Sequence, residues 1–165
     1  MNIKVKLIDK NIKLEQFGNW IDLQTREHIV LNAPVTIKKL SNDTGGLIES
    51  VKFDSIFIPL GIAMTLPKWY KAEIKPRSST FKKYGIIQTN SIGEIEWDYC
   101  KEWLFPALAI RECKIPAYER ICQFQIKIRE DAPWYAKLYD LFKKDFKFVY
   151  VDKLTTKRGG IGHTG

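Results

Sequence analysis

The sequence predicts an all-β fold, a sandwich or a barrel, with one short helix near residues 132–145. Short segments rich in apolar and β-branched residues follow one another and are separated by proline and glycine. The first ten residues set this pattern, because Ile3, Val5 and Leu7 alternate with polar residues, as they do along a strand. The helical segment differs from the rest, since its apolar residues between 134 and 142 recur with helical spacing.

The other elements follow in order along the chain. Residues 40–50 hold Ser, Asn, Asp, Thr and a glycine pair, so they are expected to form a loop or a hairpin tip. For the helix, Asp131 is a candidate N-cap and Pro133 lies in the first turn. Residues 1–154 are expected to form one domain and 155–165 a glycine-rich tail. The expected strands are 51–67 (broken at Pro59 and Gly61), 72–76, 84–90, 94–99, 103–113, 120–128 and 146–151.

Composition narrows the function. The chain has 165 residues, which suffice for one domain with a sizeable core, and no apolar run is long enough to span a membrane. Three cysteines without a CxxC pair favour a reducing compartment, and two histidines argue against a histidine-based metal centre. The net charge of +8 favours an anionic partner, but the Lys and Arg residues are scattered, so a nucleic-acid partner is not expected.

Two segments carry donors for an anion. In KPRSSTFKKYG (75–85), the planar fork of Arg77 and the hydroxyl groups of Ser78 and Ser79 suit phosphate oxygens, although a polar turn that closes a strand has the same composition. In the tail, KRGGIGHTG (157–165), glycines allow backbone N–H groups to surround an anion. The tail is not a P-loop, because no GK[ST] follows.

Two further segments combine polar side chains with strand-like alternation. TNSIGEIEWDY (89–99) places Glu94, Glu96 and Asp98 at every second position, and the turn at SIGE predicts a β-hairpin whose free backbone groups, with Asn90, suit the edge of a pyrimidine ring. A solvated acidic hairpin is the alternative. In AYERICQFQI (117–126), an amide on a buried face at Gln123 needs a partner, unless this is an edge strand with its glutamines in water.

The order of five motifs along the chain resembles that of the trimeric dUTPase family. The motifs are GNWIDL (18–23), PRSS, TNSxGxIxxxY, ERICQF and the terminal RGGxGxTG. The forms GNWIDL, PRSST and RICQF are similar to the phage and prophage branch of Gram-positive bacteria. The resemblance implies a jelly-roll or distorted β-barrel, a homotrimer with active sites shared between subunits, and a location in the bacterial host cytoplasm. It also implies hydrolysis of dUTP to dUMP and pyrophosphate, with Mg²⁺ held mainly by the substrate phosphates and not directly by the protein.

The resemblance assigns the catalytic roles to Glu96, Asp22 and Arg77. Glu96 stands six residues after Asn90 and three before Tyr99, where the family has an aspartate that acts as general base. The extra methylene moves the carboxylate by roughly an ångström, and a misplacement of that size can cost about 10²-fold in rate. Glu94 and Asp98 fall on variable positions of the motif and are expected to be solvated.

The resemblance also assigns the substrate contacts. Uracil and deoxyribose are expected to contact Asn90, Gly93, Ile95 and Tyr99. The triphosphate is expected to contact Arg77, Ser78, Ser79, Gln123, Arg158, Gly160, His163 and Thr164. The family has an aromatic residue where this chain has Ile161, so Ile161 or Trp103 is expected to cover the uracil, and Phe105 is expected in the core.

Other functions fit parts of this pattern. A low-activity or inactive dUTP-binding regulatory protein on the same fold would keep the phosphate donors, and a regulatory protein partner would then be expected. A dCTP deaminase-like enzyme shares the fold and an RSS motif, but the spacing from Asn90 to Tyr99 argues against it. A nucleic-acid-binding barrel leaves PRSS and the tail unexplained. Residues 130–154 are interpreted as an insertion, either on the trimer surface or as a partner-binding element.

Overall fold

The structure is a computed structural model that describes residues 1–40, 46–142 and 145–155. Strands dominate it, as the sequence predicts, and the largest sheet has five strands in the order β11-β9-β14-β3-β2. All of its neighbouring strands are antiparallel. Its strands are β11 (Gly93–Glu96), β9 (Tyr70–Pro76), β14 (Arg120–Ile128), β3 (Trp20–Gln24) and β2 (Glu15–Phe17).

Two three-stranded sheets and one short pair complete the body. The order of the first is β15-β1-β8 and that of the second is β10-β12-β7, and β13 pairs with β4. Their strands are β15 (Lys147–Tyr150), β1 (Asn2–Leu7), β8 (Ile62–Thr65), β10 (Ile86–Gln88), β12 (Leu104–Ala109), β7 (Ser55–Pro59), β13 (Cys113–Ile115) and β4 (Ile29–Leu31). The predicted strand 103–113 is therefore two strands, because a turn at residues 110–112 separates β12 from β13.

The core lies between these sheets. Trp103, Phe105 and Phe124 are fully buried, and the rings of Trp103 and Phe124 meet edge to face with centroids 5.2 Å apart. The prediction that Phe105 is a core residue is confirmed. The prediction of Trp103 as a lid over uracil is wrong, because none of its surface is exposed and its ring packs on Phe124. A large apolar ring gains more free energy in the core than in a mobile cover.

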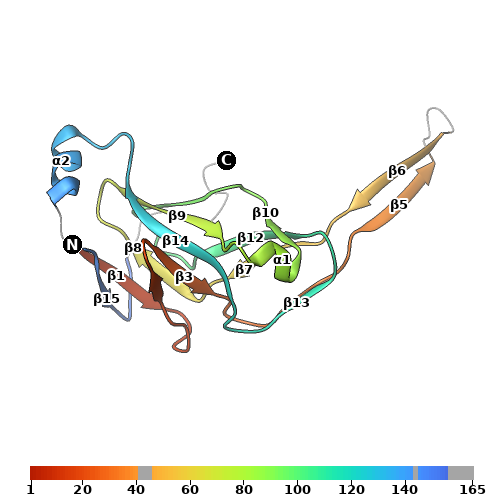
Figure 1. Ribbon diagram of the computed structural model, residues 1–165, viewed down its shortest axis with the longest axis horizontal. Coiled ribbons are helices and arrows are strands. Elements are labelled where there is room, and N and C mark those ends of the chain that lie inside the picture. Colours follow the sequence, from red (N-terminus) through yellow and green to blue (C-terminus); the bar gives the residue numbers. More distant parts are fainter. Residues whose placement is uncertain (41–45, 143–144, 156–165) are drawn as a thin grey trace.

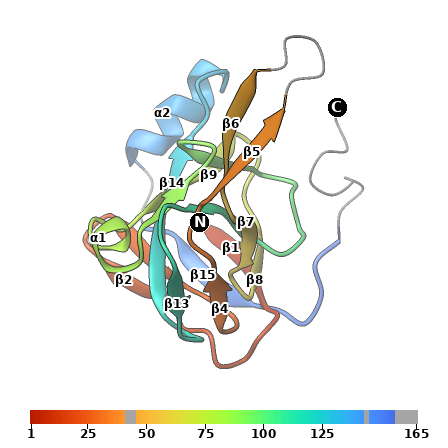
Figure 2. The ribbon, with the colours of Figure 1, turned by 90° about the vertical axis from the view of Figure 1, so that its right-hand side faces the viewer.

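Residues 40–50, predicted as a loop or a hairpin tip, belong to a hairpin: of the described ones, Leu40 and 47–50 are strand. β5 (Val35–Leu40) and β6 (Leu47–Lys52) pair over their whole length, from Val35 opposite Lys52 to Leu40 opposite Leu47. Figures 1 and 2 show this hairpin leaving the body as a separate arm. Its tip, residues 41–45, lies outside the described residues.

Two helices are present in the described part of the chain, where the sequence predicts one. α1 (Thr80–Tyr84) was missed because it is a single turn, too short for apolar periodicity, and it ends at Gly85 in the left-handed conformation at φ 64°. α2 (Trp134–Phe142) confirms the predicted helix with narrower bounds. The Tyr70 hydroxyl donates to Asp140 Oδ1 of this helix at 2.9 Å, and none of the helix side chains is buried.

No helix in the described ranges is long and apolar enough to cross a membrane. The cysteines Cys100, Cys113 and Cys122 are free, and burial of Cys122 raises the pKa of its thiol well above the usual value.

Candidate functional site

Asp22, Arg77 and Gln123 come together on the five-stranded sheet. Gln123 on β14 lies directly opposite Asp22 on β3. Arg77 follows β9, its backbone N–H donates to the carbonyl oxygen of Ile121 at 3.1 Å, and its Nε lies 3.3 Å from Asp22 Oδ1. Asp22 is buried, so its carboxylate fixes the guanidinium of Arg77 while leaving the outer face of that group, about 29% of the side chain, toward solvent.

Arg120 completes this cluster from the start of β14. Its Nη1 lies 2.8 Å from Glu15 Oε2 and 3.5 Å from Asp22 Oδ2. The Asp22 carboxylate therefore lies between two guanidinium groups, which compensate its charge. The two guanidinium groups thus face two carboxylates, Asp22 and the partly exposed Glu15, and the solvent-facing part of Arg77 is what this cluster offers to a phosphate.

Ser78 and Ser79 occupy the short loop between β9 and α1, and both are exposed. The loop is anchored at Thr80, which is buried and whose hydroxyl donates to the carbonyl oxygen of Ile121. Gly85 closes the other end of α1 by donating its N–H to the carbonyl oxygen of Phe81 at 2.7 Å. Two free hydroxyl groups are thus presented beside Arg77 by a loop fixed at both ends.

Gln123 is half-buried on a central strand, between Asp22 on β3 and Lys75 on β9. The alternative of an edge strand is wrong, because β14 pairs with β9 on one side and β3 on the other. A register shift between Arg120 and Cys122 also buries Ile121, which the simple alternation places on the same face as Gln123.

The segment around Asn90 is not the two-stranded hairpin that the sequence predicts. β10 pairs with β12, whereas β11 pairs with β9 in a different sheet, so the chain crosses from one sheet to the other between residues 89 and 92. Ser91 makes this crossing at a positive φ of 56°. The backbone groups here are therefore not used by a ladder between β10 and β11.

Gln88 and Gly93 position the Asn90 side chain. Gln88 is buried, and its Nε2 donates to Asn90 Oδ1 at 2.7 Å and to the carbonyl oxygen of Ile74 at 3.2 Å. A Cβ at Gly93 would lie 3.3 Å from Gln88 Nε2 and 3.6 Å from Asn90 Nδ2. Glycine at this position lets the amide pair lie close to β11, and the exposed Asn90 keeps its amide N–H₂ available to a ligand.

Ile95, Glu96 and Tyr99 follow on the same segment. The predicted strand 94–99 ends at Glu96, because the Tyr99 N–H donates to the Glu96 carbonyl oxygen at 3.1 Å in a tight turn. Asp98 therefore does not continue the alternation of Glu94 and Glu96. Burial, together with the charge of Glu102, raises the pKa of Tyr99, so its ring is presented as a neutral phenol.

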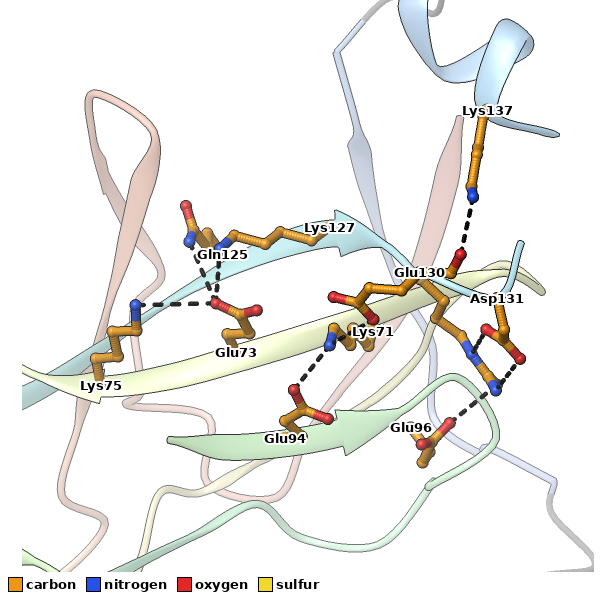
Figure 3. A network of polar contacts seen from close by, with 11 residues as sticks. Lys71, Glu73, Lys75, Glu94, Glu96, Gln125, Lys127, Glu130, Asp131 and Lys137 are labelled. Atoms are coloured by element: carbon orange, nitrogen blue, oxygen red, sulfur yellow. Dashed lines mark hydrogen bonds and ion pairs between the residues drawn. The ribbon is translucent and has the colours of Figure 1, made fainter. Parts of the chain in front are cut away.

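Each glutamate of β11 meets a cation (Figure 3). Glu94 is exposed to solvent, as predicted, and its Oε1 also lies 2.7 Å from Lys71 Nζ. Lys71 also lies 3.0 Å from Glu130 Oε2. Glu96 Oε2 accepts a hydrogen bond from Arg129 Nη1 at 3.1 Å.

Arg77 and Glu96 lie at opposite ends of β9, whereas Gly93 lies between them, opposite Ile74. Glu96 is opposite Lys71, at the start of this strand, whereas Arg77 follows its end. Six residues of extended chain separate these two backbone positions by roughly 20 Å. One chain therefore brings Asp22, Arg77 and Gln123 together, and separately Asn90 and Gly93 beside Gln88, but it does not bring Glu96 to Arg77.

The tail residues expected at the phosphates and over the base lie outside the described residues; they are Arg158, Gly160, Ile161, His163 and Thr164.

Sequence reasoning missed Gln88, Lys71 and Arg129. For Gln88 the sequence held a signal, because Gln88 shares a strand face with Ile86 and precedes Asn90 by two positions. For Lys71 and Arg129 none existed, because their partners lie 23 and 33 residues away and only strand pairing joins them.

In the described ranges, no group of three or more His, Cys, Asp or Glu side chains could hold a metal ion. Asp22 is the acidic group nearest the phosphate donors, and its buried Oδ2 has no hydrogen-bond partner. That oxygen is closed off from solvent and lies 3.5 Å from Arg120 Nη1, so it does not offer an open position to a metal ion.

No protein-family model matches the chain. A deoxyuridine 5'-triphosphate nucleotidohydrolase derived from the SPbeta prophage of Bacillus subtilis is 38% identical over 173 residues, which cover 100% of this chain and 99% of that protein. Another, from Finegoldia magna, is 34% identical over 66% of this chain and 69% of its own length.

Solved structures share the fold. The dUTPase of Streptococcus mutans superimposes with a TM-score of 0.57 at 17% identity, covering 74% of this chain and 88% of that one. The dUTPase of phage phi11 of Staphylococcus aureus reaches 0.60 at 12% identity, over 79% and 92%. The all-β prediction and the resemblance drawn from the motifs are thus confirmed, and the chain belongs to the deoxyuridine 5'-triphosphate nucleotidohydrolase (dUTPase) family.

Proposed function

We propose that the protein hydrolyses dUTP to dUMP and pyrophosphate. The observation that carries this proposal is the pair of clusters on one sheet, one suited to a triphosphate and one to a pyrimidine nucleoside, in a chain 38% identical to a prophage dUTPase over its whole length. Arg77, Ser78, Ser79 and Gln123 bind the phosphates through charge-assisted hydrogen bonds and hydroxyl donors.

Asn90 and the backbone around Gly93 bind the uracil ring, and Ile95 lines that site. The Asn90 N–H₂ donates to a carbonyl oxygen of the base, because Gln88 already occupies Asn90 Oδ1. The ring of Tyr99 packs against deoxyribose and leaves no room for a 2′-hydroxyl. The preference for dUTP over UTP follows from this contact.

Glu96 is the general base. Its carboxylate accepts a proton from a water molecule as that water attacks the α-phosphorus in line with the leaving pyrophosphate. Arg77 neutralises the negative charge that develops on the phosphate oxygens, and buried Asp22 keeps its guanidinium in place. Mg²⁺ would be held mainly by the phosphates of the substrate and would supply further charge neutralisation, while Asp22 would contribute by keeping Arg77 in place.

The active site is assembled from more than one copy of the chain. In one chain, the backbone positions of Arg77 and Glu96 lie roughly 20 Å apart along the direction of β9. This supports a shared site, because the residue that binds the triphosphate and the residue that activates water must both lie within a few ångströms of the same dUTP molecule. A closed homotrimer satisfies the requirement, since every copy gives its phosphate cluster to one site and its Glu96 to another. Residues of the tail, namely Arg158, Gly160, Ile161, His163 and Thr164, close over the bound nucleotide.

The test is release of pyrophosphate in the presence of Mg²⁺ from dUTP, dCTP, dTTP and UTP. Wild type is expected to release it from dUTP alone, and Glu96→Gln is expected to bind dUTP without turnover. Binding of dUTP without release by wild type would instead favour the regulatory alternative. Release from dCTP with loss of ammonia would favour the deaminase-like alternative.

A further inference from the structure

Arg129 bridges the carboxylates of Glu96 and Asp131, both labelled in Figure 3. It follows β14 directly, and its backbone N–H donates to the carbonyl oxygen of Trp69 at 2.7 Å. Its Nε and Nη2 donate to the two carboxylate oxygens of Asp131 at 2.9 and 2.8 Å. Its remaining terminal nitrogen, Nη1, donates to Glu96 Oε2 at 3.1 Å.

This geometry limits what the Glu96 carboxylate can do. A guanidinium held by two parallel bonds to a carboxylate has a fixed plane, so the direction of its third donor is fixed as well. Arg129 occupies one oxygen of Glu96 and leaves the other, Oε1, free to accept a proton from water. Because the Glu96 side chain is 37% exposed, this free oxygen can be reached by solvent or by a nucleotide.

Glutamate has one more rotatable bond than aspartate, and each rotamer-rich side chain must be ordered at a cost in free energy before it can act. The hydrogen bond from Arg129 restricts that additional torsion. Lys71, opposite Glu96 on β9, does not duplicate this bond, since it pairs with Glu94 and Glu130. The charge of Asp98 also acts on Arg129, beside those of Glu96 and Asp131.

We propose that Arg129, clamped by Asp131, is the positioning residue that lets a glutamate serve as the general base of this enzyme. The inference rests on the proposed function, in which Glu96 activates water. If Glu96 were the mark of a degraded active site, Glu96→Asp would raise turnover; this inference predicts the opposite. The shorter Glu96→Asp side chain no longer reaches Arg129 and the water together, so this change lowers turnover, although it restores the residue type expected of the family.

The experiment compares steady-state dUTP hydrolysis by wild type, Glu96→Gln, Glu96→Asp, Arg129→Gln, Arg129→Lys and Asp131→Asn. Arg129→Gln is expected to lower kcat by about 10- to 100-fold, the range for a misplaced reacting group, with KM within about twofold of wild type. Arg129→Lys keeps the charge but not the fork, so it recovers only part of the loss, and Asp131→Asn gives an intermediate loss. Lys38→Gln, which removes an ion pair with Glu49 at 2.7 Å on the β5–β6 arm, is the control and leaves kcat unchanged.

A double-mutant cycle completes the test. If Arg129 acts through Glu96, the double variant Glu96→Asp/Arg129→Gln has about the same kcat as the slower of the two single variants. Multiplicative losses in the double variant, or a rise in kcat for Glu96→Asp alone, overturn the inference. Thermal unfolding midpoints show whether each variant folds. If the Arg129 variants do not fold, the kcat of Asp131→Asn, which keeps Arg129 itself, tests the inference.

The outcomes separate the inference from the function on which it rests. A wild-type protein that releases no pyrophosphate from dUTP, or a Glu96→Gln variant as fast as wild type, overturns the proposed function and this inference with it. An active wild type and an inactive Glu96→Gln, with wild-type kcat for both Arg129→Gln and Asp131→Asn, overturn the inference alone.

Discussion

Removing Lys71 and removing its two carboxylate partners are expected to lower the stability of the fold by different amounts. The Lys71 side chain is 9% exposed, whereas Glu94 is 51% and Glu130 is 81% exposed. Lys71→Met removes the buried charge, and the two carboxylates that remain are hydrated by solvent, so the expected cost is about 1 kcal/mol. The double variant Glu94→Gln/Glu130→Gln leaves a buried ammonium without a carboxylate, and the expected cost is about 2–3 kcal/mol.

The assay is thermal unfolding of wild type and both variants at one protein concentration, because association changes apparent stability. For a chain of this length, 1 kcal/mol corresponds to a shift of roughly 2–4 °C in Tm. We therefore expect a loss of about 2–4 °C for Lys71→Met and at least twice that for the double variant. A larger loss for Lys71→Met than for the double variant would refute the reasoning that burial of the cation decides the cost.

The pH dependence of the same pair follows from the pKa of Lys71. Hydrogen bonds to Glu94 and Glu130 raise this pKa from 10.5 to about 12, despite the opposing effect of burial. A raised pKa in the folded protein means that the stabilisation is complete below pH 10.5 and is lost as the pH rises through about 12. The difference in Tm between wild type and Lys71→Met should accordingly stay constant from pH 7 to pH 10 and shrink above pH 10.5.

Three further changes test other parts of the structure. Gly93→Ala places a Cβ 3.3 Å from Gln88 Nε2 and displaces Asn90. Steady-state kinetics should therefore show a KM for dUTP about tenfold higher, with little change in kcat. An unchanged KM would argue against Asn90 as the contact to the base. Asp22→Asn frees Arg77 and should lower kcat about 10²-fold, whereas a wild-type rate would mean that Arg77 needs no anchor. Gly61→Ala, at φ +68° and 2.7 Å from Ile12 Cγ1, should cost about 1–3 kcal/mol in urea unfolding, and a neutral result would show that this turn adapts.

Local patterns in the sequence predicted most of the fold. Alternation located β1 and β14, because burial of one face leaves a period in the sequence, and apolar runs between turn residues located β9 and β12. Helical spacing located α2, although none of its side chains is buried. Pairing between distant strands leaves no such period. The sequence therefore could not show that β10 and β11 belong to different sheets, or that β5 and β6 pair over their whole length in one arm.

The candidate site shows the same division. Motif order located Asp22, Arg77, Gln123 and Asn90, each in a segment whose local chemistry suits its role. The assignment of Trp103 as a lid was wrong because the sequence around an aromatic residue looks the same whether its ring covers a ligand or fills the core. Arg129 had no local signal, since only the register of β9 with β11 and β14 brings it to Glu96.

The most direct test of the central claim, an active site made from the Arg77 cluster of one chain and the Glu96 of another, is complementation. Arg77→Gln and Glu96→Gln, each inactive alone, are mixed in equal amounts, unfolded and refolded together. Random assembly gives each site an intact Arg77 with probability one half and an intact Glu96 with probability one half, so we predict about a quarter of the wild-type rate of pyrophosphate release from dUTP. No activity in a mixture whose wild-type control refolds to full activity would contradict the claim and place both residues of each site in one chain.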